Sequence, residues 1–278
     1  MPKVRIGDVG LYYQWHGRED APVLALVNGI LMNAASSWIR QTGVFARAYR
    51  VLQHDCRGQG LSDHPEGPYS MAQHADDLAG LLDRLGVERA HVLGISYGGE
   101  VAQAFALRHG ARLRSLILAD TVSEVGPELR LVAEAWRAAA LGGDADALFA
   151  SSAPWNFSPA FIAANEALLQ EARRRYRDLD LPAVARLCEA FLGVGFTERL
   201  PEIAAPTCVI VGGGDILKGK TYARRIASRV PQCELHTIEG AGHAACWEQP
   251  DAFNTVVLGF LAKQASRGDS SDRPAVAG

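Results

Sequence analysis

Five short segments dominated by apolar residues constrain the fold of this chain more than any other feature. Each has four or five residues and is followed closely by Gly, Asn or Asp; they are 23–27, 50–53, 90–93, 116–119 and 208–211. Short continuous runs rich in Val, Ile and Leu are typical of strands that are buried on both faces of a parallel sheet. The sequence therefore predicts such a sheet at the centre of the molecule.

Helical patterns separate these predicted strands, at 71–85, 97–108 and 222–229. In the first of them, Ala75, Leu78 and Leu82 recur at spacings of three and four, which places them on one face of a helix. Alternating strands and helices with short loops indicate βαβ units, in which helices cover both faces of the sheet. We therefore expect an α/β fold.

The alternation is interrupted between residues 121 and 206. That segment contains many alanines and no convincing strand, and it shows helical patterns at 128–140, 159–176 and 181–191. Because it is too long for a loop in a compact domain, we expect a helical cap inserted into a core formed by residues 1–120 and 207–264. The polar segment 265–278 lacks periodicity and is predicted to be disordered.

Charge and composition exclude several classes of protein. The chain has 28 Lys and Arg against 31 Asp and Glu, a formal net charge of -3, so it offers no basic surface for nucleic acid or for a membrane. No stretch approaches the roughly 18 apolar residues of a membrane span, and the N-terminus lacks the apolar part of a secretion signal. The five cysteines are scattered without metal-site spacing, which favours unpaired thiols. We expect a cytoplasmic protein with no bound metal.

The most specific local motif is G-x-S-x-G, formed by Gly94, Ser96 and Gly98 between a predicted strand and a predicted helix. A strand that turns directly into a helix strains the backbone of its central residue, and small neighbours relieve the crowding. The Ser96 hydroxyl would then stand above the carboxyl edge of the sheet. The N–H of Tyr97 lies beside it, at a helix start that favours an anion. Ser96 is therefore a candidate nucleophile.

Four further segments accompany this motif: Asn28-Gly29-Ile30, Asp55 to Ser62, Gly212 to Asp215, and Gly240 to His243. With them, nearly the whole chain resembles α/β-hydrolase fold proteins of the serine esterase and enol-lactonase branch. Many members have His-Gly where this chain has Asn-Gly, a variation also seen in enol-lactonases. The resemblance implies a mostly parallel sheet of about eight strands, helices on both faces, and a helical cap.

The resemblance also implies a catalytic triad in the order Ser, acid, His. Three histidines follow Ser96 in the sequence. His109 lies at the far end of the helix that begins at the nucleophile, and His236 lies within a predicted strand. His243 lies in a glycine-rich loop directly after that strand. A loop at this edge of the sheet can bring an imidazole to the serine, so His243 is the expected base.

Two aspartates are candidates for the acid. Asp215 follows a predicted strand through three glycines, and Asp120 directly follows the neighbouring predicted strand, a position that some relatives use. We favour Asp215 as the group that orients His243, and Asp120 is the alternative.

Family logic assigns the oxyanion hole to the backbone N–H groups of Ile30 and Tyr97. The side chains that we expect to line a substrate pocket are Leu31, Trp155, Phe157 and Trp247. The segment 155–157 is expected to form a cap loop that faces the cleft, because prolines flank it. The inner face of the cap is expected to build the acyl pocket.

The expected reaction is hydrolysis of a small carboxylic ester or lactone through an acyl-enzyme on Ser96, with no metal or organic cofactor. Serine at position 96 argues against haloalkane dehalogenases and epoxide hydrolases, which carry Asp there. Carbon–carbon bond hydrolases and cofactor-free perhydrolases use the same triad and are open alternatives. A ligand receptor that reuses the fold without catalysis is the non-enzymatic alternative. The sequence does not indicate the oligomeric state.

Overall fold

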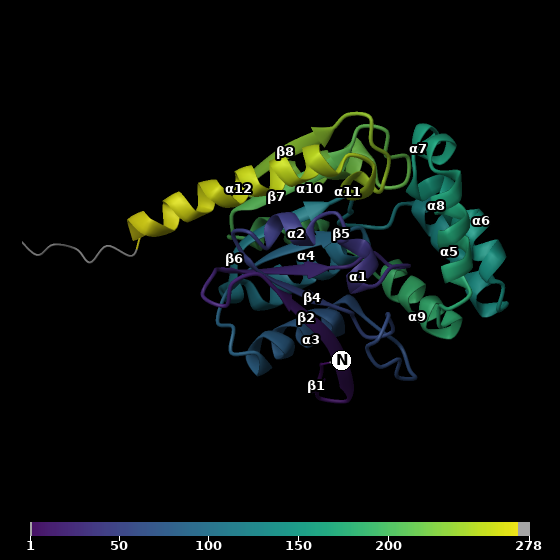
Figure 1. The fold of residues 1–278 in the computed structure, drawn as a ribbon, viewed down its shortest axis with the longest axis horizontal. Coiled ribbons are helices and arrows are strands. Elements are labelled where there is room, and N and C mark those ends of the chain that lie inside the picture. Colours follow the sequence, from purple (N-terminus) through teal and green to yellow (C-terminus); the bar gives the residue numbers. More distant parts are fainter. Residues whose placement is uncertain (1, 272–278) are drawn as a thin grey trace, which may run out of the picture.

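Within residues 2–271, the part of the chain that the computed structural model describes, an eight-stranded and mostly parallel sheet forms the centre of the protein (Figure 1). This confirms the predicted fold class. The strands, in chain order, are β1 (Lys3–Ile6), β2 (Val9–His16), β3 (Val23–Val27), β4 (Arg50–His54), β5 (Ala90–Ile95), β6 (Leu113–Ala119), β7 (Thr207–Gly212) and β8 (Cys233–Ile238). Their order across the sheet is β1-β2-β4-β3-β5-β6-β7-β8. β2 is antiparallel to both of its neighbours, and the other neighbouring strands are parallel.

Burial explains which strands the sequence reveals. Every residue of β5 and of β7 is buried, because helices cover both faces of the sheet at these strands. Such strands need no alternation of polar and apolar residues. The edge strands β1 and β8 consist mostly of exposed and half-buried positions, so no continuous apolar run marks them.

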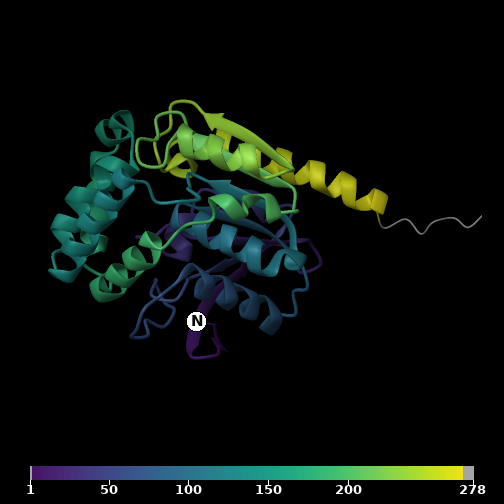
Figure 2. The same ribbon diagram turned by 180° about the vertical axis from the view of Figure 1, so that it is seen from behind.

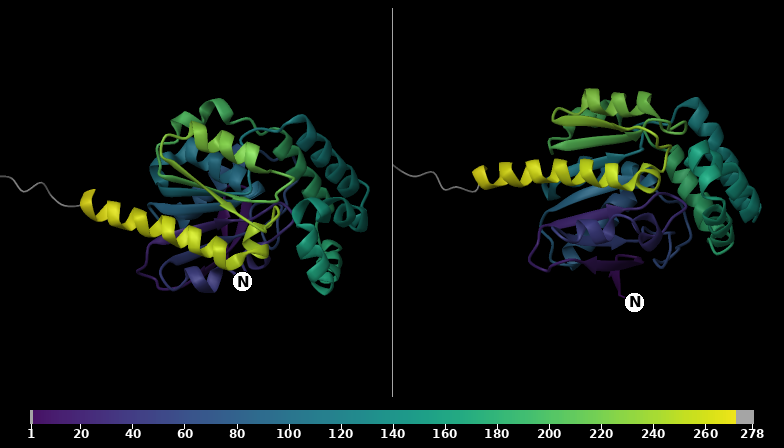
Figure 3. Two further views of the ribbon diagram at one scale, coloured as in Figure 1. Left: turned by 90° about the horizontal axis from the view of Figure 1, so that it is seen from above. Right: turned by 45° about the horizontal axis from the view of Figure 1, so that its top comes forward.

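Helices pack on both faces of the sheet (Figures 1 and 3). One face carries α3 (Met71–Arg84), α4 (Tyr97–His109) and α10 (Lys220–Arg229); the other carries α2 (Thr42–Phe45), α11 (Ala245–Glu248) and α12 (Pro250–Ser271). The short α1 (Ala34–Ser37) follows β3, and the 3-10 turn η1 (Gly110–Arg112) follows α4. In the described part of the chain, no helix combines the length and the apolar character needed to cross a bilayer.

Between β6 and β7, where every residue is described, the chain forms five helices at one end of the sheet (Figure 2). These cap helices are α5 (Pro127–Leu141), α6 (Ala145–Asn156), α7 (Pro159–Ala164), α8 (Glu166–Tyr176) and α9 (Leu181–Leu192), and the 3-10 turn η2 (Thr197–Glu202) leads back to the sheet. The chain leaves β6 at its carboxyl end, and the cap helices stand over this carboxyl edge of the sheet. After η2, the chain returns to the amino end of β7.

Two parts of the cap differ from the sequence-based expectation. Trp155 lies in the last turn of α6 and not in a loop, because the helix continues through Pro154 to Asn156. A proline near a helix end removes only one intrahelical hydrogen bond, and the N–H of Phe157 still donates to Ala153 (3.2 Å). The pattern at 159–176 is divided into α7 and α8 at Asn165.

The C-terminal segment also differs from the expectation of disorder. Helix α12 continues to Ser271, so residues 265–271 are helical. Phe253, Val257 and Phe260 anchor the first part of α12 against the sheet, and adding residues to a formed helix requires no further nucleation. The remaining part of the predicted tail, residues 272–278, lies outside the described residues.

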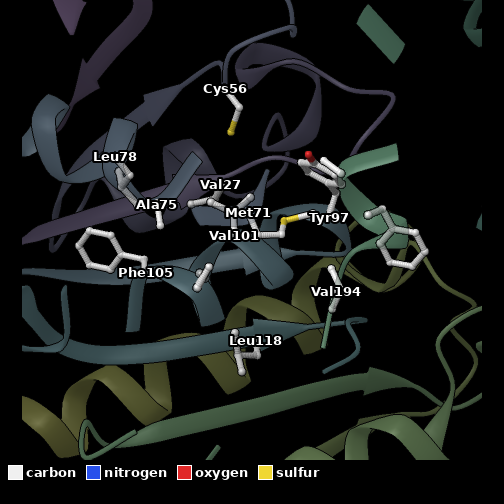
Figure 4. Close-up of a cluster of buried hydrophobic side chains, with 14 of the residues drawn as sticks. Val27, Cys56, Met71, Ala75, Leu78, Tyr97, Val101, Phe105, Leu118 and Val194 are labelled. Carbon is white, nitrogen blue, oxygen red and sulfur yellow. The ribbon is translucent and has the colours of Figure 1, made fainter. Parts of the chain in front are cut away.

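The packing of α3 against α4 holds the helix that follows Ser96. Figure 4 shows Met71 and Ala75 of α3 among the side chains of Tyr97, Val101 and Phe105 of α4, in one buried cluster. Tyr97 is 1% exposed, and its hydroxyl lies 2.7 Å from Nε2 of His74 in α3. Both apolar and polar contacts with α3 therefore fix the first turn of α4.

A buried ion pair joins α4 to the loop after β7. Lys218 Nζ donates to both carboxylate oxygens of Glu100, at 3.0 and 2.9 Å, and the two side chains are 6% and 0% exposed. The same carboxylate accepts the N–H of Val122 (3.0 Å). Breaking such a pair leaves an uncompensated charge in a medium of low dielectric constant, which costs far more than the loss of a surface pair.

We predict that Lys218→Met lowers the free energy of unfolding by about 3–5 kcal/mol, measured by urea denaturation. Lys263→Met is the matched control, because Lys263 forms an exposed pair with Glu234 (2.7 Å), and it should change stability by about 1 kcal/mol or less. Equal losses in the two variants would contradict this account of the buried pair.

Candidate active site

The backbone at Ser96 has the strained turn that the G-x-S-x-G motif predicts. Ser96 lies between β5 and α4 with φ 53° and ψ -119°, and its N–H donates to the carbonyl of Ala119 on β6 (2.9 Å). A Cβ on Gly94 would overlap the carbonyl of Gly98, and a Cβ on Gly98 would overlap the carbonyl of Val27. Both positions therefore require glycine for the turn to close.

His243 reaches this serine from the loop after β8. Its Nε2 lies 2.9 Å from Ser96 Oγ, and its Nδ1 lies 2.9 Å from Oδ2 of Asp215. A carboxylate at Nδ1 favours the tautomer that carries its proton there. Nε2 is then free to accept the serine proton. The structure thus brings together the three residues that the sequence proposed as nucleophile, base and acid.

Asp215 is buried and fully hydrogen bonded. Its Oδ2 faces His243, and its Oδ1 accepts the backbone N–H groups of Leu217 and Lys218, both at 2.8 Å. Burial opposes its ionisation, but His243 and the two N–H donors outweigh that effect and lower the pKa of Asp215 below its ordinary value. Asp215 is therefore held as a carboxylate beside the imidazole.

The alternative acid, Asp120, has a different environment. Its Oδ1 accepts the N–H of Gly212 (2.8 Å), and its side chain is completely buried. Burial is the largest cause that raises the pKa of Asp120 well above its ordinary value, and the negative charge of Asp215 is the second. The structure therefore pairs Asp215 with His243, while Asp120 braces the end of β7 and favours its neutral form.

Ile30 and Tyr97, the expected oxyanion donors, both lie beside Ser96 at a cavity wall. The sequence reasoning missed Gln59, whose Nε2 donates to the carbonyls of Gly29 (2.8 Å) and Ile30 (3.2 Å). In a trans peptide the N–H points away from the carbonyl. By holding the Gly29 carbonyl, Gln59 turns the Ile30 N–H to the opposite side. A glutamine in the loop after β4 gives no sequence signal for this contact.

Asn28, which replaces the more common histidine, does not line either cavity described below. Its side chain donates to the carbonyl of His54 (2.9 Å) and accepts from Trp38 Nε1 (3.0 Å). Both contacts are buried and hold the loop that carries Ile30. Asn28 therefore acts as a structural brace, and its amide contacts His54, Asp55 and Trp38 instead of the Ile30 N–H.

The cap contacts the loop of the base directly. The N–H of Ala244 donates to the carbonyl of Asn156 at the end of α6 (2.9 Å), and the N–H of Ser158 donates to Glu248 (3.2 Å). A Cβ on Gly242 would lie 2.7 Å from the Ser158 nitrogen, so the backbone of the cap and that of the His243 loop pack closely. The position of His243 thus depends on the cap as well as on the sheet.

Ser96 lies where two cavities of very different size meet. The larger one has a volume of about 550 Å³ and lies between the core and the cap, and three of the predicted pocket residues, Leu31, Phe157 and Trp247, line it. The smaller one has a volume of about 20 Å³. Trp155 differs from the expectation, because it lines neither cavity and is 37% exposed. Its position in the final turn of α6 directs it outward.

One group of metal-binding side chain types lies far from this site. Cys208 and Glu234 face each other across β7 and β8, and the donor atoms of these two residues and His236 lie within 4.8 Å of one another. Lys263 donates to Glu234 (2.7 Å), and burial raises the pKa of the Cys208 thiol. The carboxylate already has a cation, and the thiol resists deprotonation, so we assign no metal to this group.

Comparisons with known proteins show the family to which this chain belongs. A family model described as alpha/beta hydrolase fold matches residues 22–250. A protein from Caulobacter sp. (strain K31), named as a candidate carbamate hydrolase RutD, is 32% identical over 92% of this chain and 97% of its own length. An enol-lactonase from Burkholderia xenovorans LB400, whose crystal structure is known, has 28% sequence identity to this chain. The two structures match with a TM-score of 0.88 over 94% of this chain and 100% of that one. The hydrolase MGS-M2 from a deep-sea metagenome is 26% identical, with a TM-score of 0.89 over 94% of this chain and 97% of that one. The chain therefore belongs to the alpha/beta hydrolase fold family.

Proposed function

We propose that the protein is a serine hydrolase that cleaves a carboxylic ester or lactone through an acyl-enzyme intermediate. The observation that carries this proposal is the unbroken chain of contacts from Ser96 Oγ to His243 and on to Asp215, at 2.9 Å each, at the wall of a large cavity. The similarity to an enol-lactonase supports it. The direct test is turnover of p-nitrophenyl acetate and p-nitrophenyl butyrate, and its loss after treatment with a serine-directed phosphonate.

In the proposed reaction, Ser96 Oγ attacks the carbonyl carbon while His243 Nε2 takes the serine proton. The tetrahedral intermediate places its negative oxygen near the N–H groups of Ile30 and Tyr97. Each such donor contributes about 3 kcal/mol in other enzymes. Collapse of the intermediate breaks the bond to the alkoxy oxygen, to which His243 returns the proton. Water then repeats the sequence on the acyl-enzyme and releases the carboxylic acid.

Asp215 keeps the imidazole in the productive tautomer and stabilises the imidazolium that forms in both steps. Its position in a buried environment strengthens this interaction, because little water screens it.

We predict that Ser96→Ala and His243→Ala each lower kcat for p-nitrophenyl acetate by about 10⁴-fold or more, and that the double variant is little worse. The residues act as one unit, so their losses should not add. Ser228→Ala, at an exposed position on α10, is the control and should leave kcat unchanged. A Ser96→Ala protein that keeps about a tenth of the activity would rule out this nucleophile.

The two aspartates give a second prediction. Asp215→Asn should lower kcat by about 10⁴-fold, because the amide favours the wrong His243 tautomer. Asp120→Asn should lower it by about tenfold or less, because Asn can still accept the Gly212 N–H and resembles the neutral acid. Steady-state kinetics of both variants provide the comparison, and the reverse ranking would make Asp120 the acid.

The same Asp120 variant has a stability signature. A raised pKa means that the folded protein holds a proton that the unfolded chain loses above the ordinary value of 3.8. The contribution of Asp120 to stability is therefore fully present below pH 3.8. It is lost as the pH rises from 3.8 to the raised pKa of the folded protein. Asp120→Asn should remove that part of the slope in urea titrations at several pH values, and an unchanged slope would count against a neutral Asp120.

Gln59 gives a further prediction. Gln59→Leu should lower kcat by about 10- to 100-fold, less than the loss of an oxyanion donor itself, because the Ile30 N–H remains but is less well oriented. KM should change little, while the melting temperature should fall, because the carbonyls of Gly29 and Ile30 lose a buried donor. Gln232→Leu, at an exposed position where the amide contacts Ala204, is the matched control. A raised KM with unchanged kcat would show that Gln59 serves binding and not the oxyanion hole.

A further inference from the structure

The two cavities that meet at Ser96 differ in volume and in most of the residues that line them. Ser96 and Ile30 line both of them. The small chamber, defined here as the cavity of about 20 Å³, has room for one group the size of a methyl or a water molecule. The large chamber, the cavity of about 550 Å³, is in the range of sites that bind whole organic ligands. A carbonyl carbon on Ser96 carries two substituents, and each must enter one of these spaces.

The position of the base decides which substituent enters which space. His243 lines the large chamber and is not among the residues that line the small one. Under the proposed function, His243 Nε2 must deliver a proton to the alkoxy oxygen when the tetrahedral intermediate collapses. The alkoxy oxygen must therefore lie on the side of the carbonyl carbon that faces the large chamber. The acyl substituent is left on the opposite side.

We propose that the small chamber is the acyl subsite and the large chamber is the alcohol subsite. The substrates are then esters in which an acyl group the size of acetyl is joined to a bulky apolar alcohol. This inference rests on the proposed serine hydrolase function. In the first half-reaction the Ser96 Oγ–carbon bond forms, the carbon–alkoxy bond breaks, and the serine proton leaves on the alcohol through His243. In the second, water supplies the hydroxyl of the released acid and the proton that returns to Ser96.

The walls of the small chamber select against polar acyl groups. Cap helices α5 and α9 provide Val132, Trp136, Cys188 and Phe191. Lys218 is the charged member of the wall, but its Nζ already donates to both oxygens of Glu100 and lies 4.5 Å from the centre of the Phe191 ring. A carboxylate would have to compete with Glu100 for this lysine. A carbamoyl group would bury two N–H donors among side chains that include no amide or carboxylate acceptor.

The walls of the large chamber suit an apolar alcohol with room to spare. Leu31, Phe157 and Trp247 are apolar members of the wall, and charged residues such as Arg175 and Asp180 contribute to the same cavity. The acyl and alkoxy carbons of a lactone are joined in one ring, so a lactone cannot place them in two separate chambers. The geometry thus favours open-chain esters over lactones.

Two series of esters test this assignment. One varies the acyl group on a fixed alcohol (p-nitrophenyl acetate, butyrate and octanoate), and the other varies the alcohol on a fixed acetyl group (methyl, butyl, octyl and naphthylmethyl acetate). We expect kcat/KM to fall by at least about tenfold from acetate to butyrate, since a butyryl chain exceeds the chamber by two methylene groups. It should rise along the acetyl series. A preference for octanoyl esters, for a succinyl ester over an acetyl ester, or for γ-octalactone over octyl acetate would overturn the proposal.

Two variants separate the chambers. Trp136→Ala should raise the butyrate-to-acetate ratio of kcat/KM by about tenfold or more and leave the order of the alcohols unchanged. Phe157→Ala should change the order of the alcohols and leave the acyl ratio unchanged. If Trp136→Ala fails to fold, Val132→Ala enlarges the same chamber by a smaller amount and should move the ratio in the same direction. The opposite pattern would assign the acyl group to the large chamber.

Failure of this inference and failure of the proposed function give different results. If the protein turns over esters but the acyl and alcohol preferences are reversed, the serine mechanism stands and the assignment of the chambers is wrong. If no ester is turned over and a serine-directed phosphonate leaves Ser96 unlabelled, the proposed function itself is wrong.

Discussion

The positive φ of Ser96 is the constraint on which the site depends. A serine held at φ 53° between a strand and a helix places its hydroxyl above the sheet edge, where no regular element would put it. That conformation is maintained because Gly94 and Gly98 let three backbone segments pass in contact and because α4 is anchored on α3. The parallel direction of β5, β7 and β8 brings the other two proposed catalytic residues to the same place. Their carboxyl ends meet at one edge, so the loops that carry Ser96, Asp215 and His243 converge there.

Around this point, the two buried aspartates differ in their hydrogen-bond partners, and Oδ2 of Asp120 has none among the described residues. Asp215 and Asp120 lie on adjacent strand ends in a similar degree of burial, yet their environments move their pKa values in opposite directions. The difference comes from His243 and two backbone N–H groups, which face Asp215. Two carboxylates near each other in a medium of low dielectric constant cannot both ionise without cost, and the protonated one can act as a neutral brace. One residue type thus serves two purposes in one site.

The sequence predicts the parts of this site that follow from local spacing. The G-x-S-x-G motif requires a strand-to-helix turn, and Asp215 and His243 each follow a strand, so their convergence could be expected from a parallel sheet alone. The sequence could not show contacts between distant residues with no shared pattern, such as Gln59 with Gly29 or Lys218 with Glu100. It also misplaced Trp155. A proline next to an aromatic residue suggests a loop, but tertiary packing let α6 continue past it. The division of the site into two unequal chambers depends on how the cap helices pack, which no single segment encodes.

The proposed covalent acyl-enzyme on Ser96 can be detected by mass spectrometry. The protein is mixed with p-nitrophenyl acetate, quenched in acid within the first turnovers, and digested. We expect a mass gain of one acetyl group on the peptide that contains Ser96, and no gain on that peptide in Ser96→Ala. An acetyl group found only on another residue, or full turnover in a protein whose Ser96 never becomes acetylated, would contradict it.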